Sequence, residues 1–276
     1  MNPIITLTTD FGTKDYFVGA IKGRLYNELP EAKIVDISHK IAPFSINETA
    51  YIIKNAYHHF PKGSIHLIAV DAEYSEENKH IAILLDGHYF ICADNGVMSL
   101  ITANFNPEKV IEINFTHNES DAYFLINFVN TACHLARGGK LNLIGRDYPN
   151  IKIIQELKAF VNPEKNKIIG NILYIDNFGN AISNISKKVF NEIGKGRKYE
   201  VKTRHYTFSN IHQKYNDIVN FDVDATQRKD DGKKLILFNS DGYLEVSVYR
   251  SNLDSVGGAS SLLSLKYRDT LTIDFS

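Results

Sequence analysis

The hydrophobic pattern changes character near the middle of the chain, and this change constrains the fold more than any other feature. In the first half, short apolar runs alternate with longer segments whose apolar residues recur at helical spacing. We expect strands at 4–8, 33–37, 64–70, 80–85, 88–93 and 109–115, and helices at 16–29, 46–59 and 121–137. Strands that alternate with helices are typical of an α/β domain with a mainly parallel sheet.

The second half contains short strands with few helices. We expect strands at 168–175, 181–185, 199–204, 235–239, 243–249 and 270–275. Repeated short strands with turn residues between them predict a small β-barrel or a β-sandwich. The polar stretch at 162–167 is the predicted linker, so the α/β domain covers 1–161 and the all-β domain covers 162–276. The very polar segment 211–231 is predicted to be a long mobile excursion.

Composition excludes several classes of protein. The 276 residues carry a formal net charge of -1, so no basic excess attracts nucleic acid or an anionic membrane. The chain contains no apolar run of about 18 residues, so we expect no membrane span. The N-terminus lacks the pattern of a signal peptide. Cys92 and Cys133 lie in apolar stretches without metal-ligand spacing and are expected to be buried, reduced thiols. We therefore predict a cytoplasmic protein without nucleic-acid or membrane partners.

The common catalytic motifs are absent from the sequence. The chain has no phosphate loop, no dinucleotide fingerprint, no GxSxG elbow and no HExxH motif. His58 and His59 are adjacent, so on a helix they would point about 100° apart and would not share a metal. His134 lies among apolar residues and is expected to be a satisfied core histidine. We predict no metal site and no cofactor.

Polar residues that follow strands are the remaining candidates for chemistry. Asp10, Asp71 and Asp94 each follow an apolar strand, and the carboxyl ends of parallel strands are where ligands bind in such sheets. A carboxylate there suits sugar hydroxyls or an ammonium group, because it accepts several hydrogen bonds. Each residue also has a structural alternative: Asp10 and Asp15 as helix caps, and Asp94 as part of a turn.

Several segments together resemble one family. They are TTDFGTKDYFVGAIKG at 8–23, IVDISHKIAPFSI at 34–46, FPKGSIHLIAVD at 60–71, ADNGVMSL at 93–100 and IDNFGNAISNI at 175–185. They are similar to segments of the S-adenosylmethionine (SAM) hydroxide adenosyltransferases, which are SAM hydrolases related to fluorinase and chlorinase. The resemblance implies an α/β domain, a C-terminal β-barrel and a homotrimer with sites between subunits. SAM is then the substrate, and water attacks the ribose C5′ to give adenosine and methionine.

The resemblance implies roles for residues of the first domain. Asp15 matches the carboxylate that holds the ribose hydroxyls, and Asp10 matches the acidic start of the same loop. Phe44 takes a usually aromatic position near the reacting carbon. Asp94 and Asn95 match the loop beside the pocket.

It also implies roles for residues of the second domain. Asp176 matches the carboxylate that meets the amino group of the methionine moiety. Phe178 and Asn180 match the aromatic and amide groups that contact the adenine. Ser240 falls near the methionine carboxylate, although no arginine follows it here.

The residues that handle the water depart from the family pattern. Asp71 matches the aspartate of an Asp–Arg–His set, but Asn78 stands in place of the arginine and Tyr123 in place of the histidine. The sequence therefore predicts slow hydrolysis, with Asp71, Asn78 and Tyr123 as the substituted set and Lys79 or His80 as possible partners of Asp71. The alternative is a trimeric protein that binds SAM or adenosine without catalysis. A different nucleophile such as halide is a third reading, although Tyr74 and Phe124 replace the family's halide donors.

Overall fold

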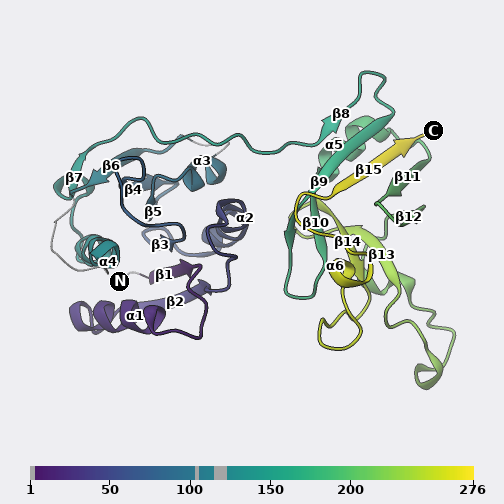
Figure 1. Ribbon diagram of the computed structural model, residues 1–276, viewed down its shortest axis with the longest axis horizontal. Coiled ribbons are helices and arrows are strands. Elements are labelled where there is room, and N and C mark those ends of the chain that lie inside the picture. Colours follow the sequence, from purple (N-terminus) through teal and green to yellow (C-terminus); the bar gives the residue numbers. More distant parts are fainter. Residues whose placement is uncertain (1–3, 103–105, 115–122) are drawn as a thin grey trace. The chain divides into compact units, whose positions relative to one another are not determined.

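The computed structural model describes residues 4–102, 106–114 and 123–276, apart from the side chains of 123–125. The chain forms two compact units, residues 1–155 and 156–276 (Figure 1). The N-terminal unit is an α/β sheet with helices on both faces, and the C-terminal unit is an antiparallel barrel.

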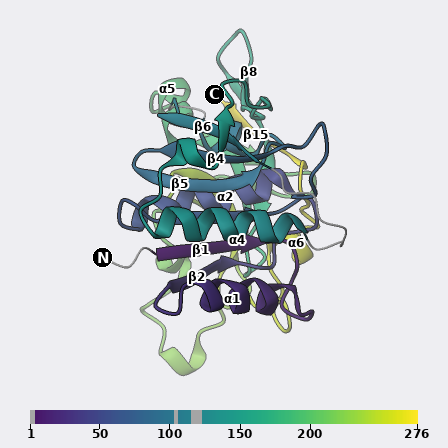
Figure 2. The ribbon, with the colours of Figure 1, turned by 90° about the vertical axis from the view of Figure 1, so that its left-hand side faces the viewer.

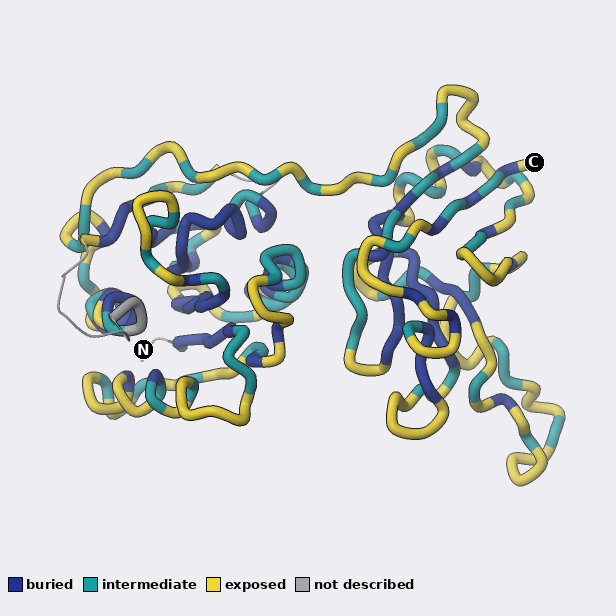
Figure 3. Tube along the Cα trace, viewed as in Figure 1, coloured by how far each residue is buried: buried dark blue, intermediate teal, exposed yellow. Residues whose placement is uncertain are grey.

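A seven-stranded sheet forms the centre of the N-terminal unit, in the order β2-β1-β3-β5-β4-β6-β7. The strands are β1 (Ile4–Thr9), β2 (Lys33–Ser38), β3 (Ile65–Ala69), β4 (His80–Leu85), β5 (His88–Ala93), β6 (Lys109–Ile113) and β7 (Gly145–Asp147). Strands β2, β1, β3 and β5 are parallel, whereas β4 is antiparallel to both of its neighbours. The predicted mainly parallel sheet is confirmed. Figure 3 shows β1, β3 and β5 buried along almost their whole length.

Helices cover both faces of this sheet. They are α1 (Phe17–Glu28), α2 (Ile46–Ala56) with the 3₁₀ turn η1 (Tyr57–His59), α3 (Val97–Ile101), α4 (Tyr123–Ala136) and the 3₁₀ turn η2 (Leu141–Leu143). Helices α1 and α4 share one face (Figure 2), where Leu25 and Phe128 belong to the same buried cluster. Ile53 of α2 and Met98 of α3 belong to a separate cluster. Two layers of apolar side chains thus enclose the central strands β1, β3 and β5, which are almost wholly buried, as strands covered by helices on both faces are.

Turn residues stand where the local sequence predicts them. Asp86 and Gly87 join β4 to β5 with φ angles of 47° and 72°, the left-handed conformations that a tight hairpin requires. Gly138, with φ of 82°, follows α4. Both signals are local, so they could be identified from sequence.

The C-terminal unit is a near-closed antiparallel barrel, with strand order β12-β11-β15-β9-β10-β14-β13 and β8 paired to β9. Its strands are β8 (Phe160–Val161), β9 (Lys167–Ile175), β10 (Ala181–Ser186), β11 (Tyr199–Lys202), β12 (Thr207–Phe208), β13 (Lys234–Phe238), β14 (Tyr243–Val248) and β15 (Thr270–Phe275). Helices α5 (Lys187–Gly194) and α6 (Ala259–Leu262) and the 3₁₀ turns η3 (Tyr215–Ile218) and η4 (Ala225–Gln227) complete it. The barrel prediction is confirmed, and the sandwich alternative is wrong.

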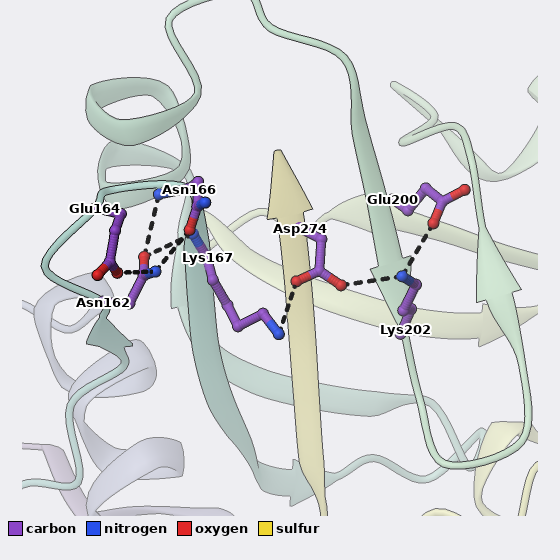
Figure 4. Close-up of polar contacts among 7 residues, drawn as sticks. All are labelled: Asn162, Glu164, Asn166, Lys167, Glu200, Lys202 and Asp274. Atoms are coloured by element: carbon purple, nitrogen blue, oxygen red, sulfur yellow. Dashed lines mark hydrogen bonds and ion pairs between the residues drawn. The ribbon is translucent and has the colours of Figure 1, made fainter. Parts of the chain in front are cut away.

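The polar stretch 162–167 is a turn inside the barrel unit, between β8 and β9. The Asn162 side-chain oxygen accepts hydrogen bonds from the backbone N–H groups of Asn166 (3.1 Å) and Lys167 (2.8 Å), as Figure 4 shows. Lys167 and Lys202 then flank Asp274 at 3.0 Å each, which links β9, β15 and β11. The segment predicted as a linker therefore helps to hold the sheet, because its amide side chain closes a hairpin.

The structure also bears on membrane spans, metal-binding groups and the two cysteines. Within residues 4–102, 106–114 and 123–276, no helix is long and apolar enough to cross a membrane. The same residues contain no group of three or more His, Cys, Asp or Glu side chains arranged to hold a metal ion. Cys92 and Cys133 are buried free cysteines, as expected, and burial raises the pKa of both thiols.

Candidate functional site

The carboxyl ends of the parallel strands bring four of the predicted residues to one edge of the sheet. Strands β1, β3 and β5 are consecutive in the sheet and in register, so the residues that follow them share that edge. These residues are Asp10, Asp71 and the pair Asp94 and Asn95. A ligand at this edge therefore meets side chains from three separate chain segments.

Asp10 is bound to the segment that carries Phe44. One oxygen of the Asp10 carboxylate accepts a hydrogen bond of 2.9 Å from the Phe44 backbone N–H. Phe44 has a φ of 62°, an uncommon conformation for an aromatic residue, and its side chain is 71% exposed. An exposed ring on a left-handed backbone does not contribute to the core, so it is available to a ligand.

Asp15 lies exposed in the loop before α1. The N-cap of α1 is Tyr16, without a side-chain capping hydrogen bond and without an acidic residue in the first turn. The helix-cap alternative for Asp10 and Asp15 is therefore wrong. The Asp15 carboxylate accepts no hydrogen bond from the part of the chain that the structure describes.

Asp71 follows β3 in a left-handed conformation, with φ of 45°. Its backbone carbonyl accepts hydrogen bonds from the Asn78 amide (3.0 Å) and the Asn95 amide (3.2 Å). Its carboxylate is half-buried and accepts no hydrogen bond from any described residue. The backbone of Asp71 is thus firmly held, while its side chain is left for a ligand or water.

Asp94 has a different environment, because both of its oxygens are already engaged. They accept hydrogen bonds from the Tyr148 hydroxyl (3.0 Å) and the Lys152 backbone N–H (2.8 Å), and Asp94 is only 5% exposed. Burial, together with the hydrogen bond to Asp94, raises the pKa of Tyr148. Asn95 is also satisfied: its amide nitrogen donates to Val70 and Asp71, and its oxygen accepts from the Val97 N–H. Both side chains fix the backbone around the site.

The residues predicted as partners of Asp71 offer little basic character where the structure describes their side chains. The Lys79 ammonium pairs with Glu76 at 2.6 Å, and this hydrogen bond raises the pKa of Lys79, so the amine stays protonated. Burial lowers the pKa of His80 to about 4, against the opposing hydrogen bond to the Ala72 carbonyl, and its Nε2 lies 2.9 Å from that oxygen. Tyr123 begins α4, but its side chain lies outside the described residues.

The barrel unit carries the second group of predicted residues, on the loop between β9 and β10. The Asp176 carboxylate accepts hydrogen bonds from the backbone N–H groups of Phe178 (2.9 Å) and Asn180 (2.8 Å) and from the Asn180 side-chain amide (2.9 Å). Gly179 reaches φ of 77° at the tip, and Phe178 is left 59% exposed. The loop thus presents an aromatic ring beside a fixed carboxylate. Ser240 lies exposed in the turn between β13 and β14.

Glu245 on β14 is a residue that sequence reasoning missed. It is 3% exposed and accepts hydrogen bonds from the hydroxyl groups of Tyr215 (2.7 Å) and Ser247 (2.5 Å). Burial raises the pKa of Glu245, and the nearby Asp176 carboxylate adds to this effect. Tyr215 belongs to η3, so this contact anchors the polar segment 211–231 to the barrel. A signal was available, since Glu245 interrupts an otherwise apolar run in a predicted strand.

A cavity of about 840 Å³ lies elsewhere in the N-terminal unit. Residues at the start of β6 and the end of β7 line it, among them Lys109, Asp147 and Tyr148. None of the predicted site residues lines this cavity.

An α/β unit with carboxylates at its strand ends, followed by an antiparallel barrel with an Asp-x-Phe-Gly-Asn loop, defines a two-domain class. Models of the SAM hydroxide adenosyltransferase N-terminal and C-terminal domains match residues 5–145 and 170–272. The chain belongs to the SAM hydroxide adenosyltransferase family, which is related to the fluorinases.

Two named relatives and one solved structure are similar to this chain over most of its length. The chain is 31% identical to the (R)-S-adenosyl-L-methionine hydrolase of Methanocaldococcus jannaschii, over 98% of this chain and 95% of that protein. It is 24% identical to a fluorinase of Actinoplanes sp., over 89% and 91% of the two chains. A conserved protein from Thermotoga maritima has a similar structure, with a TM-score of 0.80 and 26% identity over 98% and 99% of the two chains.

Proposed function

We propose that this protein hydrolyses SAM to adenosine and methionine, with water attacking the ribose C5′ and the sulfonium leaving as methionine. The observation that supports this reaction best is the Asp71 carboxylate. It accepts no hydrogen bond from the described residues, and it stands at the carboxyl edge of the sheet on a firmly held backbone. It is the group that accepts the proton from the attacking water. A relative with 31% identity carries the name of a SAM hydrolase.

Each of the remaining site residues is assigned to one part of SAM. Asp15 holds the ribose hydroxyls, and Phe44 packs beside the reacting carbon. Asp176 accepts from the amino group of the methionine moiety, while Phe178 and Asn180 contact the adenine. Ser240 lies at the methionine carboxylate, and Asp94 and Asn95 support the loop beside the pocket. SAM enters as a substrate, and the proposal requires no cofactor or metal.

The proposed turnover is slow. Unassisted water is a poor nucleophile, with a pKa of about 15.7, and a well-placed base typically contributes about 10²–10⁴-fold in rate. Asn78 has no charge, Lys79 is paired with Glu76, and His80 is neutral near pH 7 because burial lowers its pKa to about 4. Asp71 consequently acts without the cationic partner that would strengthen the nucleophile.

The experiment is incubation of the purified protein with SAM, with adenosine and methionine detected by chromatography. Wild type is expected to form both products in equal amounts, and Asp71→Asn to form at least tenfold less. The isosteric amide keeps the side chain's shape but cannot accept the proton. Product formation by Asp71→Asn at the wild-type rate would show that another group handles the water.

A binding protein without catalysis is the second candidate function. It is favoured by the neutral Asn78, whose amide is engaged with backbone carbonyls. Mass spectrometry of the ligand that co-purifies with the protein separates the two functions. Adenosine and methionine support turnover, whereas intact SAM after prolonged incubation supports binding alone.

We further propose that the protein is a cytoplasmic homotrimer. Asp15 and Asp176 belong to different units, and the resemblance implies a site completed by a neighbouring subunit. Light scattering at micromolar concentration is expected to give three times the 31.2 kDa chain mass. A monomer mass would contradict the shared site.

A further inference from the structure

The backbone at Asp71 requires support from its surroundings. Left-handed conformations crowd the Cβ atom against the chain, so residues other than glycine adopt them only where contacts hold them there. Asp71 has this conformation, with φ of 45°, two residues after the end of the buried strand β3. The direction of its carboxylate depends on this conformation, because the Cα–Cβ bond turns with the backbone.

Two amide side chains supply that support at one atom. Asn78 donates to the carbonyl oxygens of Asp71 (3.0 Å) and Glu73 (2.8 Å). Asn95 donates to those of Asp71 (3.2 Å) and Val70 (3.0 Å). A carbonyl oxygen has two lone pairs, so the Asp71 carbonyl can accept both bonds at once.

Asn78 is itself held at the closing end of the loop. Its backbone pairs with Ser75 through hydrogen bonds of 3.1 Å and 3.3 Å. Its side-chain oxygen is buried and has no hydrogen-bond partner among the described residues. The two contacts of the side chain therefore come from its nitrogen, which fixes the carbonyl of Asp71 from across the loop.

We propose that Asn78 is a positioning residue, whose amide nitrogen holds the Asp71 backbone in the left-handed conformation that aims the carboxylate at the water. This inference rests on the proposed hydrolysis. It assigns Asn78 a role through Asp71 instead of direct contact with the reacting atoms. The substituted position thus supports the base without supplying charge.

The test compares Asn78→Asp with Asn78→Ala in SAM hydrolysis. Asn78→Asp keeps the side-chain shape and an oxygen acceptor but replaces the donating nitrogen, whereas Asn78→Ala removes both. A displacement of about 1 Å at a reacting group can cost about 100-fold in rate. We expect both variants to lose at least tenfold in kcat, with KM for SAM within about twofold of wild type. Ser75→Asp is the matched control, because it adds the same charge at an exposed position of the loop and should keep the wild-type kcat.

An outcome in which Asn78→Asp keeps the wild-type kcat would overturn the proposal, because the donor nitrogen would then be dispensable. Equal losses in kcat and in melting temperature for Ser75→Asp and Asn78→Asp would also overturn it, since the effect would then be general to the loop.

A crystal structure of Asn78→Asp, or of Asn78→Ala if the first variant does not fold, gives a readout without activity. We expect residue 71 to leave the left-handed region and its carbonyl to turn away from residue 78. An unchanged residue 71 would overturn the proposal whatever the rates are. If wild type proves inactive on SAM while residue 71 moves in the variant, the proposed function fails but the positioning contact stands.

Discussion

At the scale of single residues, two non-glycine positions with left-handed backbones flank the candidate site. Phe44 is held by the Asp10 carboxylate and Asp71 by two asparagine amides. Asp10 is 34 residues from Phe44 and Asn95 is 24 residues from Asp71, so these two contacts form only in the folded domain. Positions of this kind concentrate at functional sites.

Asp10 offers a direct test of this arrangement. Asp10→Ala removes the acceptor of the Phe44 N–H, so we expect the free energy of unfolding to fall by about 1 kcal/mol and adenosine binding to weaken. Asp10→Asn keeps an acceptor oxygen and should retain most of both. Urea denaturation and calorimetry measure the two effects. Equal losses for the two variants would indicate that the carboxylate charge matters more than the hydrogen bond.

Asp15 is expected to contribute more than Asp10 to nucleoside affinity. A carboxylate that holds two ribose hydroxyls makes two charge-assisted hydrogen bonds, and their loss in Asp15→Ala costs roughly 2–4 kcal/mol of binding free energy. Calorimetry with adenosine measures this change. An affinity for adenosine equal to that of wild type would contradict the assignment of Asp15 to the ribose hydroxyls.

At the scale of elements, strands β3 and β5 carry two buried histidines that the proposed chemistry does not use. The His66 Nδ1 lies 2.8 Å from the Thr6 hydroxyl, and its Nε2 lies 3.2 Å from the His88 Nδ1. Burial lowers the pKa of His66 to about 3, and burial also lowers that of His88. Lys62 and His58 lower the pKa of His88 further, whereas Asp86 raises it. Both rings are therefore neutral in the folded unit near pH 7.

Because His66 and His88 are buried and neutral, we expect the free energy of unfolding to fall in mild acid. The pKa of His66 is lower in the folded state than the value of about 6.5 in the unfolded chain, so the unfolded state binds more protons below that pH. Stability is fully present above about pH 6.5 and is lost as the pH falls toward the folded value. For His66 alone this amounts to about 2 kcal/mol between pH 7.5 and pH 5.

Urea denaturation at several pH values between 7.5 and 5 measures this effect. His66→Phe should fill a similar volume beside Phe90, whose ring stacks on His66 at 4.8 Å, and should give a shallower pH dependence. An identical slope in the variant would mean that other groups titrate in this range.

At the scale of the whole molecule, the proposed function assigns different parts of the ligand to the two units. The N-terminal unit offers carboxylates at strand ends, and the barrel offers an aromatic ring and a carboxylate on one loop. If the site is shared as proposed, changes in each unit should affect different parts of SAM.

Asp176→Asn tests this division. The loop should survive the change, because the Asn180 side-chain oxygen has no partner among the described residues and could accept from the new amide after a flip. We expect SAM binding to weaken by roughly 1.5–3 kcal/mol, the range for a charged hydrogen bond, while adenosine, which lacks the amino-acid moiety, binds as in wild type. Equal loss for SAM and adenosine would contradict the assignment of Asp176 to the amino group.

The sequence by itself determined the class of each domain, because hydrophobic periodicity and turn residues act over a few positions. Three local signals appear in the structure as predicted. They are apolar runs such as 64–70, the Asp86-Gly87 turn and the glycine after α4. The family could also be predicted, since its motifs are short and contiguous.

What a polar side chain does was decided only by the tertiary structure. Asp94 and Asn95 match a loop motif, yet Asp94 binds Tyr148, 54 residues away, and Asn95 binds Asp71, 24 residues away. Such partners meet only after the strands have paired, because a hydrogen bond depends on distance in space and leaves no trace in local periodicity.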